Sequence, residues 1–210
     1  MLRSLMISCV LAVVCLGQQI SFGQETYNLV LKIGDVAPAW VDLPGTDDKK
    51  HSSTRLKDKD VVVVVFTCLS CPTASDYEGR INDLAKKYAG DEAKVAIVPI
   101  VVNPQKADQL PALKKRVEEK EYAFHYLYDE TQKIAKEFGA VYTPEFYVLD
   151  KDRKVVYFGA LDDATDASKA TRNYVQEAID AALAGKAPEM KIVIARGCLV
   201  KYARERRRPE

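Results

Sequence analysis

The stretch Val61-Val62-Val63-Val64-Val65-Phe66-Thr67-Cys68-Leu69-Ser70-Cys71-Pro72 decides the fold. Its first half is an unbroken run of valines and a phenylalanine, without the alternation of a half-exposed strand. Such a run predicts a strand buried on both faces of a parallel or mixed sheet. Pro72 suits the first turn of a helix, and apolar residues then recur at helical spacing: Tyr77, Ile81, Leu84 and Tyr88. The two cysteines are therefore expected where a buried strand passes into a helix.

The rest of the chain alternates between strand and helix patterns. We expect a second buried strand at 94–102, an exposed helix at 107–120, a short strand at 124–128, a short helix at 131–138, a hairpin of 145–149 with 154–158, and a last helix at 166–184. This order predicts an α/β protein with a central mixed β-sheet flanked by helices on both faces.

The N-terminal residues have the pattern of an export signal. Arg3 precedes an apolar run at 5–16, and the small residues Ser21 and Gly23 suit a cleavage site, so residues 1–23 are predicted to be a signal peptide. The run is short for a membrane-spanning helix, which needs about 20 residues, although an uncleaved anchor is the alternative. The expected location is the periplasm or cell envelope of a bacterium. Residues 24–190 would form one domain, followed by a C-terminal segment at 191–210.

Charge excludes a general attraction to nucleic acid. The chain has 31 basic and 30 acidic residues, and loss of Arg3 with the signal would make them equal. The exception is the basic tail at 201–210, which is typical of a solvated end. Membrane contact is therefore expected only through the signal or this tail.

Cysteine usage indicates reactive thiols. Of the five cysteines, two lie in the predicted signal, so Cys68, Cys71 and Cys198 remain. A helix N-terminus stabilises an anion, which favours the thiolate of Cys68 as nucleophile; thiols in such settings titrate at about 3.5–7.5. Cys71 would resolve a mixed disulfide with a substrate. A purely structural disulfide is the alternative, and zinc is disfavoured because a four-ligand site usually needs a second pair of ligands.

Several motifs together resemble those of a known family. They lie at 34–38, 66–72, 127–132, 138–140 with 143–146, 159–163, and in the ending Gly197-Cys198-Leu199-Val200-Lys201-Tyr202. The chain resembles the thioredoxin-like redoxin family related to alkyl hydroperoxide reductase and thiol-specific antioxidant proteins, in particular a bacterial peroxiredoxin-like subgroup. The resemblance implies a thioredoxin-like fold over about residues 34–202. It also implies exchange with protein disulfides and with a redox protein that donates or accepts electrons, without an organic cofactor.

The same resemblance assigns a role to Thr143-Pro144. Thioredoxin folds place a cis-proline opposite the cysteine pair, and cis peptide bonds are essentially confined to proline. The backbone of Thr143 would then be available to pair with an extended substrate. Peroxiredoxins proper carry Pro-x-x-x-Thr/Ser-x-x-Cys, which is missing before Cys68; this argues against direct reduction of peroxide.

Three further observations leave alternatives open. Cys198 is either a small packed residue or a third redox thiol that approaches the pair when the tail folds back. His51 is expected to be solvated and His125 half-buried, although His125 with the two cysteines would suit copper. Asp76 and Glu78 either tune the cysteine pKa or form a solvated helix face.

The sequence thus predicts a thiol–disulfide oxidoreductase of the cell envelope that cycles Cys68 and Cys71 between dithiol and disulfide. Thr143 and Pro144 would bind the substrate, and no metal site is expected. The alternatives are a copper-binding or copper-delivery module and a thiol peroxidase.

Overall fold

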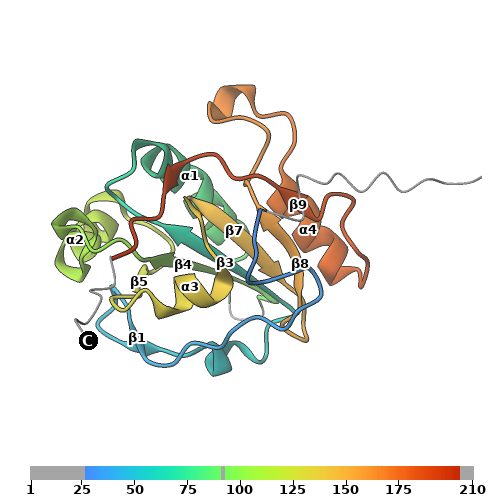
Figure 1. The fold of residues 1–210 in the computed structure, drawn as a ribbon, viewed down its shortest axis with the longest axis horizontal. Coiled ribbons are helices and arrows are strands. Elements are labelled where there is room, and N and C mark those ends of the chain that lie inside the picture. Colours follow the sequence, from blue (N-terminus) through green and yellow to red (C-terminus); the bar gives the residue numbers. More distant parts are fainter. Residues whose placement is uncertain (1–26, 91–92, 204–210) are drawn as a thin grey trace, which may run out of the picture.

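The computed structural model describes residues 27–90 and 93–203 of the 210-residue chain (Figure 1). A six-stranded sheet forms its centre, in the order β5-β4-β3-β7-β8-β9. The strands are β3 (Val61–Thr67), β4 (Val95–Val101), β5 (Leu127–Tyr128), β7 (Glu145–Leu149), β8 (Val155–Gly159) and β9 (Ile192–Val193). Because β3 is parallel to β4 and antiparallel to β7, the sheet is mixed, as the sequence predicted.

Helices and short strand pairs surround this sheet. The α-helices are α1 (Pro72–Lys87), α2 (Leu110–Lys120), α3 (Lys133–Phe138) and α4 (Tyr174–Leu183), and the 3-10 turns are η1 (Ser53–Leu56), η2 (Lys106–Asp108) and η3 (Ala167–Lys169). β1 (Leu43–Pro44) pairs with β2 (Lys50–His51), and β6 (Tyr142–Thr143) pairs with β10 (Cys198–Leu199).

The strand β3 divides the core into two layers. All its residues are buried, and successive side chains of a strand point to opposite faces. Val61, Val63 and Val65 pack with residues of α1, α2 and α4. Val62, Val64 and Phe66 pack with residues of α3 and with the N-terminal residues Leu31 and Trp40. The valine run lacks alternation because both faces of β3 are buried, as predicted, and helices cover both faces of the sheet.

The largest error in the predicted elements is the last helix. Residues 166–184 were expected to be helical, but α4 covers only Tyr174–Leu183. The Asp163 carboxylate accepts hydrogen bonds from the backbone N–H groups of Thr171 and Arg172, which holds this stretch in a loop. Asn173 then caps α4 through its side chain. The expected helix at 107–120 is likewise divided, because Gln109 is extended between η2 and α2.

The C-terminal part of the described chain returns to the domain. β9 adds to the sheet beside β8, and β10 pairs with β6 next to the cysteines. The predicted signal at 1–23 and most of the basic tail lie outside the described residues. Within the described ranges, the helices are too short or too polar to cross a membrane.

Candidate active site

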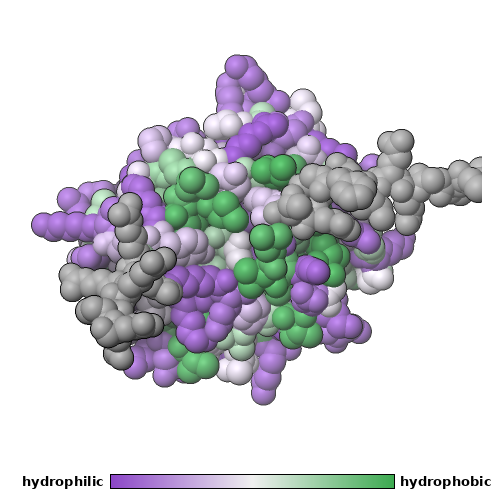
Figure 2. Space-filling view, viewed as in Figure 1, coloured by the Kyte–Doolittle hydropathy of each residue, from purple (hydrophilic) through white to green (hydrophobic). Residues whose placement is uncertain are grey.

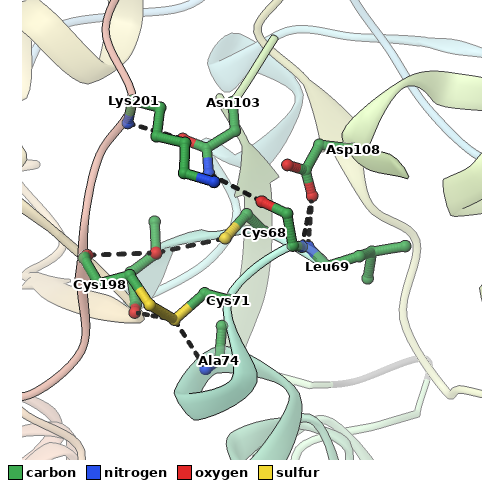
Figure 3. Close-up of a disulfide and its surroundings, with 10 residues drawn as sticks. Cys68, Leu69, Cys71, Ala74, Asn103, Asp108, Cys198 and Lys201 are labelled. Carbon is green, nitrogen blue, oxygen red and sulfur yellow. Dashed lines mark hydrogen bonds between the residues drawn. A yellow bond between two sulfur atoms is a disulfide. The ribbon is translucent and has the colours of Figure 1, made fainter. Parts of the chain in front are cut away.

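The two cysteines of the quoted stretch lie at the junction of β3 and α1 (Figure 3). Cys71 is the N-cap residue of α1, and its Sγ accepts a hydrogen bond from the backbone N–H of Ala74 at 3.4 Å. Cys68 and Cys71 are 0% and 1% exposed. The strand-to-helix junction is as predicted, but neither sulfur is open to solvent.

The disulfide in this structure differs from the predicted one. The sequence predicted a Cys68–Cys71 bond, whereas Cys71 is bonded to Cys198 and Cys68 is free. The cause is the strap, the name we give to residues 194–203, which crosses the junction and brings Cys198 to a Cα–Cα distance of 5.9 Å from Cys71. Cys198 is therefore not simply a small packed residue, and three sulfurs lie together in one site (Figure 3).

Thr143 contacts all three cysteines. Its Oγ1 lies 3.3 Å from the Cys68 Sγ and donates to the carbonyl oxygen of Cys198 at 3.4 Å. Its own carbonyl oxygen lies 3.5 Å from the Cys71 Sγ. The Thr143–Pro144 peptide bond is cis, as predicted. The backbone edge expected to pair with a substrate is here paired antiparallel with Cys198 and Leu199 of the strap.

Glu145 fixes the loop that carries Thr143. Its Oε2 accepts hydrogen bonds from the backbone N–H groups of Val141 at 2.7 Å and Tyr142 at 2.9 Å, and its Oε1 accepts from the Tyr147 hydroxyl at 2.9 Å. The Glu145 side chain is fully buried. Burial raises its pKa, and these hydrogen bonds oppose that rise.

Asp108 is a residue of the site that was not predicted from the sequence. It is the last residue of η2 and contacts the loop between the cysteines (Figure 3). Its Oδ1 accepts hydrogen bonds from the backbone N–H groups of Leu69 at 2.6 Å and Ser70 at 2.8 Å. Its side chain is 0% exposed, and its Oδ2 has no hydrogen-bond partner among the described residues. An acidic residue in the segment that follows a strand parallel to β3 is the sequence signal that could have found it, since the carboxyl ends of parallel strands meet at one edge.

Asn103, also after β4, connects the cysteine loop to the strap. Its Nδ2 donates to the Ser70 Oγ at 3.4 Å, and its Oδ1 accepts from the backbone N–H of Lys201 at 2.9 Å. The side chain is almost fully buried. Asn103 thus links the strap to Ser70, the residue before Cys71, and movement of the strap would break its hydrogen bond with Lys201.

The electrostatics of the site favour a protonated Cys68. Burial raises the pKa of this thiol, and the charge of Asp108 raises it further, while hydrogen bonds with Thr143, Ser70 and the Cys71 backbone oppose the rise. The expectation of a lowered pKa is therefore wrong for this closed form. The helix N-terminus is present, but the strap excludes water and a carboxylate already occupies two backbone N–H groups of the loop.

We expect Asp108→Asn to increase the reactivity of Cys68. Asparagine keeps an oxygen for Leu69 and Ser70 but removes the negative charge, so the pKa of Cys68 falls. In a Cys71→Ser/Cys198→Ser background, alkylation of Cys68 by iodoacetamide at pH 7 should accelerate several-fold. Mass spectrometry across a pH series measures this at Cys68 itself. An unchanged pH profile would show that Asp108 only holds the loop in place.

The remaining sequence candidates lie away from the sulfurs or have structural partners. His51 contacts Asp47 at 2.8 Å, and both His51 and His125 line a cavity of about 340 Å³ that no cysteine lines. Glu78 is buried and accepts from the hydroxyls of Tyr122 and Tyr126, so it is not a solvated face. Within 27–90 and 93–203, no group of three or more His, Cys, Asp or Glu residues could hold a metal ion.

The mixed sheet, the Cys-x-x-Cys junction and the cis-proline opposite it define a thioredoxin-like thiol–disulfide oxidoreductase. The Redoxin family model matches residues 32–179, and the chain belongs to this family. A search of the curated proteins found no match.

Solved structures agree with this assignment. An uncharacterized conserved protein from Geobacillus kaustophilus is 31% identical with a TM-score of 0.77, and 85% of this chain and 96% of that chain are covered. A hypothetical protein from Sinorhizobium meliloti is 30% identical with a TM-score of 0.75, covering 82% and 96%. A peroxidoxin from Mycobacterium tuberculosis, 22% identical with a TM-score of 0.52 over 65% and 90%, shares the fold.

Proposed function

We propose that this oxidoreductase exchanges disulfides with proteins of the cell envelope through Cys68 and Cys71, and that Cys198 is a third redox thiol. The observation that carries the proposal is the free Cys68 beside the Cys71–Cys198 disulfide, with Thr143 in contact with all three residues. A free thiol next to a disulfide is the arrangement that thiol–disulfide exchange requires.

The first step is internal. The Cys68 thiol gives up its proton as its sulfur attacks the Sγ of Cys71. The Cys68–Cys71 bond forms as the Cys71–Cys198 bond breaks, and the leaving Cys198 sulfur takes up a proton, so the proton count is unchanged. One disulfide is present before and after, so no electrons are gained or lost. The step converts the observed disulfide into the predicted one and releases the strap from its covalent bond.

The second step involves a partner protein. A thiolate of the partner attacks the Cys68–Cys71 disulfide to give a mixed disulfide, and the second thiol of the partner displaces it. The partner gains a disulfide, and Cys68 and Cys71 gain the two electrons and protons as a dithiol. In the reverse direction a partner disulfide is reduced. The reduction potential of the partner sets the direction.

Support for the cell envelope comes from the signal-like residues 1–23 and from the cysteine usage. No observation supports the copper alternative, because the cavity that His125 lines in the described structure is lined by no cysteine. None supports the peroxidase alternative either, since the buried Cys68 is covered by the strap and lacks the peroxiredoxin motif before it.

Insulin reduction by dithiothreitol tests the proposal. The wild type and Cys198→Ser should both accelerate precipitation of the insulin B chain, because each retains Cys68 and Cys71. A triple Cys68→Ser/Cys71→Ser/Cys198→Ser variant should not accelerate it. If the wild type is no faster than the triple variant, the proposed function is wrong.

A further inference from the structure

The strap occupies the backbone edge that the proposed function reserves for substrates. Cys198 pairs with Thr143 and Leu199 pairs with Tyr142, both antiparallel. The backbone N–H of Val200 continues the pairing with a bond to the carbonyl oxygen of Val141 at 2.9 Å. An extended segment whose cysteine is bonded to Cys71 thus shows what this site accommodates.

We propose that the preferred substrates are extended segments that carry a glycine immediately before the reacting cysteine and an aliphatic residue two positions after it. The proposal rests on the proposed function and adds the substrate class. The position between the cysteine and the aliphatic residue would accept any side chain. The pattern is that of Gly197-Cys198-Leu199-Val200 in the strap, which is the resident occupant of the site.

The preference for glycine follows from the backbone of the site. A Cβ at Gly197 would lie 2.1 Å from the carbonyl oxygen of Thr143 and 2.8 Å from its carbonyl carbon. These atoms belong to the backbone of β6, which is held by Glu145 through the preceding residues, so they cannot move aside as a flexible side chain would. A segment with any larger residue at this position must lie farther from Thr143 and lose the pairing.

The preference for an aliphatic residue follows from burial along the strand. Leu199 is 63% exposed, whereas Val200 is 8% exposed and packs in the core layer on the α3 side of the sheet. Alternate side chains of an extended segment point in opposite directions, so residues 198 and 200 face the protein and residue 199 faces solvent. Ile194 of the strap is exposed as well. Apolar residues are visible at the surface on the face that Figure 2 shows.

The pairing of the strap with β6 also indicates which cysteine of the protein first contacts the substrate sulfur. A segment that replaces the strap places its cysteine where Cys198 lies, bonded to Cys71. In the dithiol form of Cys68 and Cys71, which the second step of the proposed function produces, the Cys71 thiolate attacks the substrate sulfur, and the substrate's former sulfur partner leaves as a thiolate. Cys68 then attacks the Cys71 Sγ and releases the substrate cysteine as a thiol. In this order Cys68 is the resolving thiol and Cys71 meets the substrate, the reverse of the sequence prediction.

A substrate has to replace the strap, which is held on both sides of Cys198. The backbone N–H of Ala195 donates to the Tyr27 hydroxyl, and that of Ala203 donates to the Gln132 Oε1. A tethered segment has an effective concentration of about millimolar, so a free peptide competes poorly until the strap is loosened. Gly197→Ala provides the loosening, since the added Cβ meets the Thr143 carbonyl.

The test uses peptides of the sequence 196–202 in which the cysteine is a mixed disulfide with thionitrobenzoate. The protein is Cys68→Ser/Cys198→Ser, with and without Gly197→Ala, so that a peptide is trapped on Cys71 and measured there by mass spectrometry. The unaltered peptide and one with Leu199→Lys should react at the same rate. Peptides with Gly197→Ala or Val200→Lys should react at least about tenfold more slowly, equivalent to about 1.4 kcal/mol.

The outcomes separate the two proposals. Equal rates for all four peptides in both protein variants, or trapping no faster than on a free cysteine, would overturn the substrate class. Insulin reduction by the wild type reports the proposed function independently of that result, because segments without the glycine are expected to react more slowly and not to be excluded. Circular dichroism of Cys68→Ser/Cys198→Ser/Gly197→Ala establishes that the protein with the loosened strap is folded. The matched control carries Leu199→Ala in place of Gly197→Ala. Because Leu199 is exposed, the strap of this control should compete with the peptides as strongly as the unaltered strap does.

Discussion

Cys68→Ser is expected to lock the protein in its Cys71–Cys198 form. Serine occupies nearly the same space beside the Thr143 hydroxyl, but it cannot attack the Cys71 sulfur. Without that attack the strap stays bonded over the site. Insulin reduction should therefore fall on the order of a hundredfold, which corresponds to about 2.7 kcal/mol at 1.36 kcal/mol per tenfold change in rate.

The burial of the sulfurs is the reason for so large an effect. Cys71 is 1% exposed and Cys198 is partly buried, so an external thiol has little access to the Cys71 sulfur while the strap is in place. Cys68 reaches it from inside the protein. Since burial and the charge of Asp108 raise the pKa of Cys68, opening by the wild type should accelerate as the pH rises toward that pKa, and this acceleration should be lost in Cys68→Ser.

The matched control is Cys198→Ser, which cannot form the strap disulfide but retains Cys68 and Cys71. Peptide mapping of oxidised protein should find only the Cys71–Cys198 bond in Cys68→Ser and only the Cys68–Cys71 bond in Cys198→Ser. Full activity of Cys68→Ser would mean that partners open the strap directly, and the internal step would then be wrong.

The parts of the site that were predictable depend on local sequence. The run at 61–66 is buried on both faces because each side chain along it is apolar. The junction with α1 follows from Pro72, whose fixed φ suits a first helical turn. The cis bond before Pro144 could be expected only through the family resemblance, because Thr-Pro by itself indicates no more than a turn.

The parts that were missed depend on contacts distant in sequence. Cys71 and Cys198 are 127 residues apart, and no periodicity connects β6 with β10. Asp108 lies in a segment that was expected to be an exposed helix, yet its carboxylate is buried against the backbone of the cysteine loop. The loop at 170–173 has helix-forming neighbours, but hydrogen bonds to Asp163 override their propensity.

Tyr147→Ala is expected to cause the largest loss of stability. The Tyr147 ring is fully buried; it stacks on Phe158 and meets the edges of Phe66 and Phe138. Removing a buried aromatic side chain costs about 3–5 kcal/mol. At about 2–4 °C per kcal/mol for a chain of this size, thermal unfolding should occur roughly 6–20 °C lower.

The matched variant Tyr147→Phe separates packing from polar support of the site. It keeps the ring but removes the hydroxyl that donates to Glu145 and accepts from the Asn28 side chain at 3.1 Å. The expected cost is that of a lost buried hydrogen bond, about 1–3 kcal/mol. Because Glu145 holds the backbone before Thr143, Tyr147→Phe should also slow the reaction of Cys71 with the unaltered strap peptide. If the melting temperature falls but that rate is unchanged, Tyr147 stabilises the core without positioning the substrate edge.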